Sequence, residues 1–299
     1  MSKPRNPRVG NRTAAVLATL LTVLGHTFLG FEQPWAHVFV ALATGYTCAL
    51  GFEWVDARAN GRPAGFAGGW RPLADFLVSP HMTSITTSFL IYPNGRFEVL
   101  AFCVALAIGS KFLFRVPGPN GRYVHFFNPS NFGIAVTLFL FPWVSVIPYA
   151  FLEWTHGPVD AIVPLVILAL GTRLNLLFTK RIPLILTWCG AFAAQALIRS
   201  VWFDTPLLAG LSPMTGVTFV LFSFYMITDP MTSPASVRGQ VGFGVALAAA
   251  YAALMVEHVI FTLFYAVFLV TGLRGAWMYA EHLLAVRSPS QQPAPAGGK

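Results

Sequence analysis

Residues 241–275 read VGFGVALAAAYAALMVEHVIFTLFYAVFLVTGLRG. Two apolar runs, 241–256 and 258–275, are separated here by little more than the charged residue Glu257. Each run approaches the roughly 20 residues that an α-helix needs to cross the hydrocarbon core of a bilayer. Two such runs in succession predict a chain that crosses a membrane more than once.

The composition of the whole chain agrees with this stretch. Hydrophobic residues make up 56% of it and charged residues only 10%, whereas a soluble domain carries roughly 25% charged residues. The 27 Phe and 8 Trp residues exclude a solvated, disordered coil. Lys and Arg outnumber Asp and Glu by 19 to 11, but they lie between apolar runs, which is typical of membrane topology and not of a nucleic-acid surface. We therefore expect an all-α polytopic membrane protein whose surroundings are the lipid bilayer, without a nucleic-acid partner.

Ten apolar segments are the expected transmembrane spans, and two of them, rich in Ser and Thr, are short. They lie at 13–31, 35–54, 83–93, 97–114, 131–151, 159–178, 182–199, 215–228, 241–256 and 258–275. The sequence predicts one transmembrane domain over residues 13–280, between a cytoplasmic tail at 1–12 and a flexible cytoplasmic tail at 281–299. The Gly/Ala/Arg segment 55–78 is expected to be a flexible cytoplasmic loop.

The Lys and Arg residues predict the orientation of these spans. If the N-terminus is inside and the spans alternate, every Lys and Arg lies on the cytoplasmic side except Arg96 and Arg199. If one span were removed, the Lys and Arg residues would no longer lie almost entirely on one side of the membrane. The positive-inside rule therefore favours ten spans in a bacterial-type inner membrane, with both termini cytoplasmic.

A short repeat occurs at the two short spans. Residues 79–86 read SPHMTSIT and residues 212–218 read SPMTGVT; without His81 the two frames agree. The predicted topology gives these segments opposite orientations. They indicate two inverted repeats with broken half-helices that meet near the membrane midplane, although chance similarity at span starts is an alternative.

The segment 212–218 is the strongest candidate for chemistry. Small residues and hydroxyls at the first turn of a helix favour an anion such as a phosphate, because the first backbone N–H groups have no partner within the helix. Gly216 would allow a bulky group to approach the backbone. The alternative is purely structural, with Ser212 or Thr215 capping the helix and Gly216 at a close helix contact.

Other features of the sequence argue against several kinds of chemistry. Cys48, Cys103 and Cys189 are far apart within apolar runs, so no disulfide framework and no metal-binding spacing is expected. No Asp or Glu lies at the centre of an expected span, which weakens ion pumping by this chain alone. No residue pair resembles an acid–base or nucleophilic pair for hydrolysis.

Four blocks of sequence resemble the membrane-subunit family represented by NqrB and RnfD. Residues 81–94 resemble its Ser/Thr-rich half-helix that ends in proline. Residues 109–111, leading to 125–133, resemble its Gly-Lys and Phe-Asn-Pro blocks. Thr215-Gly216-Val217-Thr218 resembles its Ser-Gly-Ala-Thr flavin-attachment motif, and residues 227–234 resemble its Thr-Asp-Pro block.

The resemblance implies an electron-transfer subunit in which a flavin transferase attaches FMN to Thr218 through a phosphoester on the outer side of the membrane. Two positions depart from the motif: Ser212 stands where the transferase motif has an acidic residue, and Val217 replaces Ala. FMN bound without the ester, or no flavin at all, are the alternatives. The expected cofactor-binding residues are Thr218, Gly216, Thr215, Val217, Ser212, Asn128, Thr86, Lys111 and Asp229.

Three of these residues have both a functional and a structural interpretation. Asn128 either approaches a flavin edge or caps the following helix, with Pro129 at its first position. Asp229 either belongs to a proton or cation path or ends a span in a solvated turn. Lys111 matches the family's lysine, but its position near a span end favours a side chain that snorkels to the interface.

Residues 125–133 and 229–234 resemble most closely the UnbU-type branch found in enediyne biosynthesis clusters. This branch implies an accessory redox component whose partners are donor and acceptor proteins or a quinone. The sequence leaves open whether a second flavin, riboflavin, binds elsewhere in the helix bundle. The competing hypotheses are a transporter of a cation or small metabolite and a flavin-less structural or assembly subunit.

Overall fold

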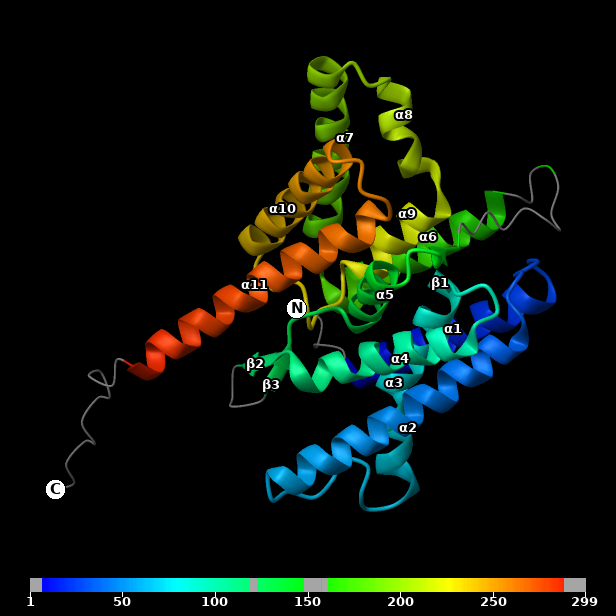
Figure 1. Ribbon diagram of the computed structural model, residues 1–299, viewed down its shortest axis with the longest axis vertical. Coiled ribbons are helices and arrows are strands. Elements are labelled where there is room, and N and C mark those ends of the chain that lie inside the picture. Colours follow the sequence, from blue (N-terminus) through cyan, green and yellow to red (C-terminus); the bar gives the residue numbers. More distant parts are fainter. Residues whose placement is uncertain (1–6, 119–122, 148–156, 158–160, 288–299) are drawn as a thin grey trace.

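The computed structural model describes residues 7–118, 123–147, 157 and 161–287, and within them the fold is almost entirely helical. The first half of the chain contains α1 (Pro7–Thr27), α2 (Trp35–Ala59), α3 (Trp70–Leu90), α4 (Phe97–Leu113) and α5 (Pro129–Leu140). The second half contains α6 (Ile162–Leu174), α7 (Ile182–Phe203), α8 (Leu207–Leu211), α9 (Val217–Leu221), α10 (Val237–Val256) and α11 (Thr262–Arg287). Figure 1 shows the halves side by side, with α5 packed against α11.

Five of the described helices are long and apolar enough to cross a membrane, and a bent helix pair would make a sixth. They are Trp35–Ala59, Ile162–Thr179, Ile182–Phe203, Val237–Val256 and Thr262–Leu284. Length and composition alone do not assign a crossing to α1, α3, α4 or α5, which cover the other expected spans of the first half.

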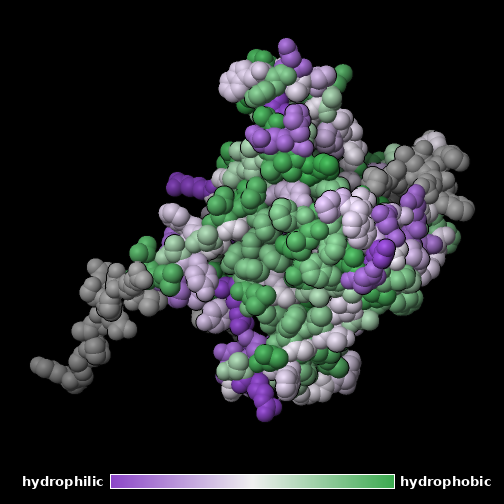
Figure 2. All heavy atoms as spheres, in the orientation of Figure 1, coloured by the Kyte–Doolittle hydropathy of each residue, from purple (hydrophilic) through white to green (hydrophobic). Residues whose placement is uncertain are grey.

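Apolar side chains cover much of the surface. Leu208, Leu113, Trp202 and Phe139 are all at least three-quarters exposed, and Figure 2 shows hydrophobic residues over the middle of the molecule with hydrophilic ones at its edges. Several hydroxyl and amide side chains are buried instead. This arrangement, apolar outside and partly polar inside, fits a lipid bilayer as surroundings.

The helix α3 differs from the expected loop and half-helix. The sequence predicts a loop over 55–78 and a short span from residue 83, but α2 continues to Ala59 and α3 begins at Trp70 and includes Pro80 in its interior. Proline removes one backbone hydrogen bond from a helix, so contacts with neighbouring helices must hold α3 together at this point.

The expected span 131–151 is also wrong in extent. The helix α5 ends at Leu140 because Pro142 follows the C-cap residue Phe141, and a residue before proline disfavours helical geometry. The chain then forms β4 (Ser145–Val146), which pairs antiparallel with β1 (Ile91–Tyr92). Residues 148–151 lie outside the described part.

Both expected tails are shorter than predicted. Helix α1 already begins at Pro7, and α11 continues to Arg287. Residues 1–6 and 288–299 lie outside the described residues.

The second Ser-Pro segment forms a broken helix, as the sequence predicts. A 3₁₀ turn, Ser212–Thr215, follows α8, and α9 continues into a π-helical segment, Phe222–Met226. The two parts meet at Gly216 with a bend of 65°. Gly216 has the extended backbone conformation of a helix N-cap, with φ −85° and ψ 146°.

Candidate functional site

Lys111, Asn128 and Asp229 come together where the two halves of the molecule touch. The Asn128 Nδ2 atom donates a hydrogen bond to the backbone oxygen of Met226 at 3.3 Å, across 98 positions of sequence. The charges of Lys111 and Asp229 interact across the same boundary. We call the charged groups gathered here the basic cluster, which consists of Lys111, His125, Arg181, Asp229 and Arg274.

Lys111 lies in the last turn of α4 and points toward α3. Its Nζ atom donates hydrogen bonds to Ser79 Oγ at 3.0 Å and to Thr83 Oγ1 at 2.8 Å. Thr83 in turn donates to the backbone oxygen of Ser79 at 3.1 Å. The ammonium group of Lys111 therefore binds hydroxyls of α3 on both sides of Pro80.

His125 and Asn128 are positioned by a small hairpin between α4 and α5. Strand β2 (Arg115–Pro117) pairs with β3 (Tyr123–His125), which returns the chain to the start of α5. Asn128 Oδ1 accepts a hydrogen bond from the Asn131 backbone N–H at 3.1 Å. The capping interpretation is confirmed, with Pro129 in the first turn of the helix.

Asn131 extends the same boundary. Its Nδ2 atom donates to the backbone oxygen of Phe264 in α11 at 3.1 Å, and its Oδ1 atom has no hydrogen-bond partner in the described part of the chain. The amides of Asn128 and Asn131 thus both join α5 to the second half.

Asp229 forms a tight turn after the π-helical segment. Its Oδ1 atom accepts a hydrogen bond from the Met231 backbone N–H at 3.0 Å, and its backbone oxygen accepts one from the Ser233 hydroxyl at 2.7 Å. The span-terminating interpretation of Asp229 is therefore what the geometry shows.

Two arginines, which the sequence indicates only as positive charges beside spans, hold this turn. Arg181 is only 5% exposed, and its Nε atom donates to Ser233 Oγ at 2.8 Å. Arg274 Nη1 donates to the backbone oxygen of Thr232 at 2.9 Å. Nothing in the local sequence distinguishes these arginines from those that simply flank a span; only the fold brings them to Asp229.

The basic cluster carries more positive than negative charge. Burial lowers the pKa of His125, Lys111 lowers it further and Asp229 opposes both effects, so the imidazole is biased toward its neutral form. Burial also lowers the pKa of Arg181, against the opposing charge of Asp229. Three basic side chains, those of Lys111, Arg181 and Arg274, therefore gather around a single carboxylate, which is an environment that attracts an anion.

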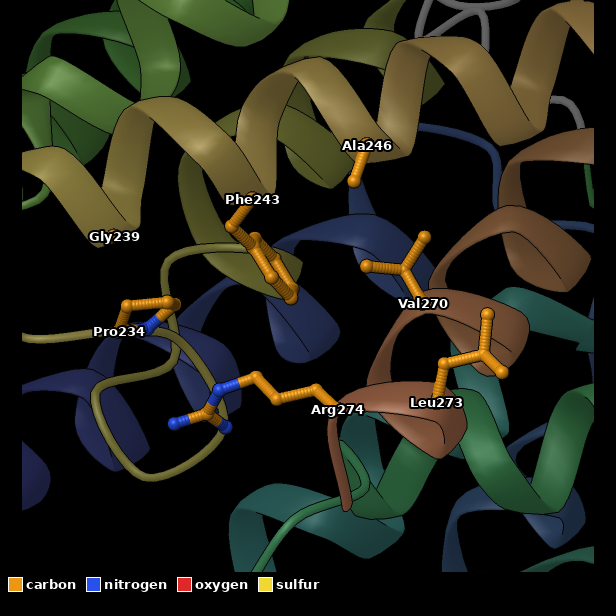
Figure 3. Close-up of a pocket in the computed structure, with 7 residues that line it drawn as sticks. All are labelled: Pro234, Gly239, Phe243, Ala246, Val270, Leu273 and Arg274. Carbon is orange, nitrogen blue, oxygen red and sulfur yellow. The ribbon is translucent and has the colours of Figure 1, made fainter. Parts of the chain in front are cut away.

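An apolar groove adjoins the basic cluster between α10 and α11. It has a volume of about 300 Å³, and Phe243, Ala246, Val270 and Leu273 line it. Figure 3 shows the Arg274 guanidinium at one end of this groove, directed toward the loop that carries Pro234.

Thr218 lies elsewhere, in the first turn of α9 at the bend of the broken helix. The hydroxyls of Ser212 and Thr215 donate to the backbone oxygens of Ala209 and Ser212, at 2.9 Å and 2.7 Å. Neither caps α9, since its N-cap residue is Gly216, which has no side chain. The capping alternative is therefore wrong for this helix.

The Thr218 hydroxyl differs from the neighbouring hydroxyls in its hydrogen bonding and in the space beside it. Thr218 is half-buried, and no hydrogen bond joins its side chain to another of the described residues. A methyl group added at Gly216 would meet only the backbone oxygen of Pro213, at 3.4 Å, so this side of the bend is open. Val217 points into the core and is 8% exposed.

Thr86, the counterpart of Thr218 in the first repeat segment, is half-buried in α3. No hydrogen bond among the described residues joins it to Thr218 or to the basic cluster. The candidate residues thus form two groups, one at the basic cluster and one at the bend, with Thr86 apart from both.

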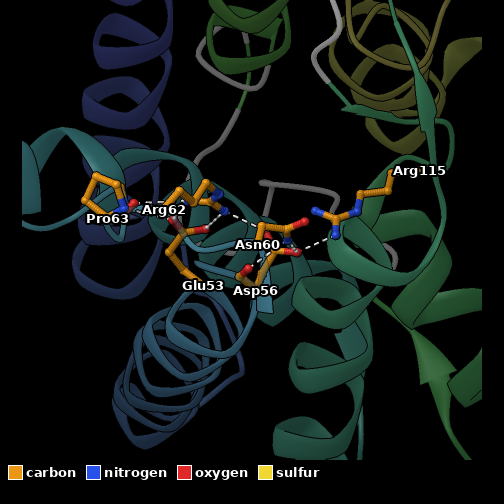
Figure 4. Close-up of polar contacts among 7 residues, drawn as sticks. Glu53, Asp56, Asn60, Arg62, Pro63 and Arg115 are labelled. Carbon is orange, nitrogen blue, oxygen red and sulfur yellow. Dashed lines mark hydrogen bonds and ion pairs between the residues drawn. The ribbon is translucent and has the colours of Figure 1, made fainter. Parts of the chain in front are cut away.

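Ion pairs gather the ends of four helices on one face of the first half. Arg62 pairs with both Glu53 and Asp56, and Arg115 also pairs with Asp56 (Figure 4). These carboxylates raise the pKa values of both arginines through hydrogen bonds and charge. Arg12 at the start of α1 pairs with Asp75 at the start of α3. These ion pairs join residues at the carboxyl-terminal ends of α2 and α4 and at the amino-terminal ends of α1 and α3.

A scan of the chain against models of known protein families finds no match, and a search of curated proteins finds no significant match either.

Proposed function

We propose that this protein is an integral membrane electron-transfer protein that carries a flavin at Thr218. The observation that carries the proposal is the Thr218 hydroxyl, which has no hydrogen-bond partner among the described residues and lies at the open bend of a broken apolar helix. FMN would be held there through its phosphate on Thr218 Oγ1, with Gly216 leaving room beside the backbone. The flavin supplies the redox chemistry, and the protein supplies its position and surroundings.

The residues at the bend fit such a group better than their neighbours do. Ser212 and Thr215 already donate their hydroxyl protons to backbone oxygens, so among the three hydroxyls of the motif Thr218 is the one without such a bond. Because Ser212 replaces an acidic residue of the transferase motif, the proposal includes a transferase that tolerates this change.

The proposal places the chain in ten crossings of a bacterial inner membrane, arranged as two inverted halves. The packing of neighbours supports a duplication: α3 packs on α1 and α2, α4 packs on α2, and α5 packs on α4. The second half repeats this pattern, with α9 on α6, α8 on α7, α10 on α7 and α11 on α10. The position of α3 is thus occupied by the pair α8 and α9.

The basic cluster would act at the opposite, cytoplasmic end of the same broken helix. Its positive charge would stabilise a reduced, anionic flavin or the anionic form of a quinone during electron entry. The blocks 125–133 and 229–234, which resemble the UnbU-type branch, meet in this cluster. We therefore propose that both blocks act in the same step, the entry of electrons.

Fluorescence in a denaturing gel tests the flavin directly. The full chain is produced with a flavin transferase, purified and viewed under ultraviolet light. We expect a fluorescent band that is absent in Thr218→Ala and retained in Thr215→Ala, whose hydroxyl serves the local backbone. A dark wild-type band, together with colourless native protein, would contradict the proposal.

Reporter fusions test the orientation independently. We expect a fusion at residue 205 to report the outer side and one at residue 180 the cytoplasmic side, because the intervening helix α7 crosses once. The reverse result would overturn the proposed topology without bearing on the flavin.

A further inference from the structure

Buried polar groups in the first half of the molecule lack partners to an unusual degree. Ser84, Thr87 and Ser88 of α3 are at most 2% exposed, and their hydroxyl oxygens have no hydrogen-bond partner in the part of the chain that the structure describes. The spacing of these three residues places them on one face of the helix.

This behaviour is uncommon for hydroxyls within helices. Elsewhere in the molecule, Thr22, Thr172 and Thr271 each donate to the backbone oxygen four residues earlier. In α3 itself, Thr83 does the same. The hydroxyls at 84, 87 and 88 leave this usual bond unmade, and buried polar groups in native proteins nearly always have a partner.

One end of this hydroxyl stripe reaches the basic cluster. Thr83 lies one residue before Ser84 and receives a hydrogen bond from Lys111 Nζ at 2.8 Å. Ser84 itself faces α2, since a methyl group at Gly45 would lie 1.8 Å from Ser84 Oγ. The stripe therefore runs through the interior of the helix bundle and not along its lipid-facing surface.

The other end adjoins Gln33, and a further unpartnered side chain, His37, follows Gln33 four residues later in the chain. Gln33 Nε2 donates to the backbone oxygens of Ser88 and Ile91, at 2.7 Å and 2.8 Å, which leaves its Oε1 atom free. His37 is 1% exposed, and neither ring nitrogen has a partner within the described ranges.

We propose that Ser84, Thr87, Ser88 and Gln33 hold a chain of water molecules that conducts protons between Lys111 and His37. Hydroxyls both donate and accept hydrogen bonds, as water does, so the mixed set of free groups matches water better than it matches a single ion. Lysine and histidine are groups that give up and regain a proton, and intramembrane histidines often serve proton relays.

The residues of the stripe disfavour a metal cation. The described part of the chain contains no group of His, Cys, Asp and Glu side chains able to hold a metal ion. The stripe also has no carboxylate, and Lys111 at its inner end repels cations. A proton path requires only an electrochemical gradient as its driving force, and it does not depend on flavin attachment at Thr218.

Proton flux into liposomes tests the path. The purified full chain is reconstituted with a pH-sensitive dye inside the vesicles, and a potassium diffusion potential drives protons. We expect a flux above that of empty vesicles. It should fall at least about tenfold in Thr87→Val, in Ser84→Ala/Ser88→Ala and in His37→Leu, because each change interrupts the hydrogen-bonded chain.

The matched control is Thr271→Val, which removes a buried hydroxyl whose bond is made to its own helix; its flux should equal that of the wild type. Thr87→Val preserves side-chain shape, so size-exclusion profiles can confirm that it folds. Wild-type flux equal to that of empty vesicles, unchanged flux in all three variants, or transport of radioactive sodium in place of protons would each overturn the proposal. Flavin fluorescence is recorded on the same vesicles, so failure of the proton path is distinguishable from failure of the flavin proposal.

Discussion

Two segments that begin with Ser-Pro have similar sequences and different structures. Residues 79–86 lie inside the continuous helix α3, which passes through Pro80. Residues 212–218 form a 3₁₀ turn and a bend at Gly216. The position of Gly216 in the second segment corresponds to Ser84 in the first.

The surroundings of the two segments explain this difference. In the first segment, His81 joins three helices: its Nε2 atom lies 2.8 Å from Thr19 Oγ1 in α1, and its Nδ1 atom lies 2.6 Å from the Tyr46 hydroxyl in α2. Lys111 adds two bonds beside Pro80. The hydroxyls of the second segment, at Ser212 and Thr215, bond only to their own backbone among the described residues. Side-chain hydrogen bonds to other helices therefore help to keep the first segment straight, whereas the described hydroxyls of the second segment make no such bonds and its helix bends at Gly216.

The two halves also differ in the hydrogen bonding of their buried polar atoms. Nearly all the buried side-chain atoms without a partner in the described part of the chain lie in the first half, and the exception is Gln195 Nε2. In the second half, Trp188 Nε1 donates to Ser223 Oγ at 2.9 Å, and Asn175 Nδ2 donates to the backbone oxygen of Phe224 at 2.8 Å. The proposed water chain and the proposed flavin thus lie in different halves.

The largest expected effect comes from exchanging glycine for alanine at Gly45, which packs against the first segment, in comparison with Gly216 at the open bend of the second. Gly45→Ala would bring a methyl group within 1.8 Å of Ser84 Oγ, so we expect a loss of about 2–3 kcal/mol in the free energy of unfolding. Gly216→Ala is the matched change in the second half, and we expect it to stay within about 0.5 kcal/mol because the bend is open. Denaturation of micelle-bound protein with SDS measures both. Equal losses would contradict the contrast between a packed and an open segment.

His81, the residue that the first segment has in addition, should affect the free energy of unfolding almost as strongly. His81→Ala removes the link between α1, α2 and α3 and leaves the Tyr46 hydroxyl without its acceptor, so we expect a loss of about 2 kcal/mol in unfolding free energy. Met214→Ala, in the second segment, serves as the comparison and should cost clearly less. An undiminished unfolding free energy in His81→Ala would show that the joint does not hold α3.

A smaller effect concerns pH and the boundary between the halves. Because the folded state lowers the pKa of His125, the unfolded chain binds more protons just below its ordinary pKa of about 6.5. The contribution of His125 to stability is therefore complete above that pH and is lost as pH falls toward the lowered value. We expect His125→Gln to flatten this dependence by up to about 1 kcal/mol, as measured by SDS denaturation between pH 5 and about 7.5.

Two further variants give the sign of each neighbour's influence on His125. Lys111→Met should raise the pKa of His125, and Asp229→Asn should lower it, because Lys111 and Asp229 act on it in opposite directions. NMR titration of labelled histidine in micelles measures both shifts. Shifts of the reverse sign would show that these groups do not form one cluster.

The sequence predicts the class of fold well because apolar composition and span length are local properties. It also predicts a broken helix at the second Ser-Pro segment, and it offers the cap formed by Asn128 as one of two interpretations. It does not predict the helix through Pro80, since the contacts of His81 and Lys111 that stabilise it come from other helices. Pro142 indicates an early end of α5, but the apolar residues on both sides of this proline predict a longer span.

The basic cluster could be predicted only in part. Lys111, Asn128 and Asp229 stand out in the sequence, whereas Arg181 and Arg274 resemble any basic residue beside a span. Their role depends on how the two halves pack, which is not encoded in a local pattern.

The mass of the tryptic or chymotryptic peptide that contains Thr218 tests the central claim most directly. The protein is taken from cells that naturally produce it, and the peptide is fragmented to locate any modification. Our proposal predicts one flavin mononucleotide joined to Thr218 with loss of water. An unmodified peptide from protein that contains no flavin of any kind would contradict it.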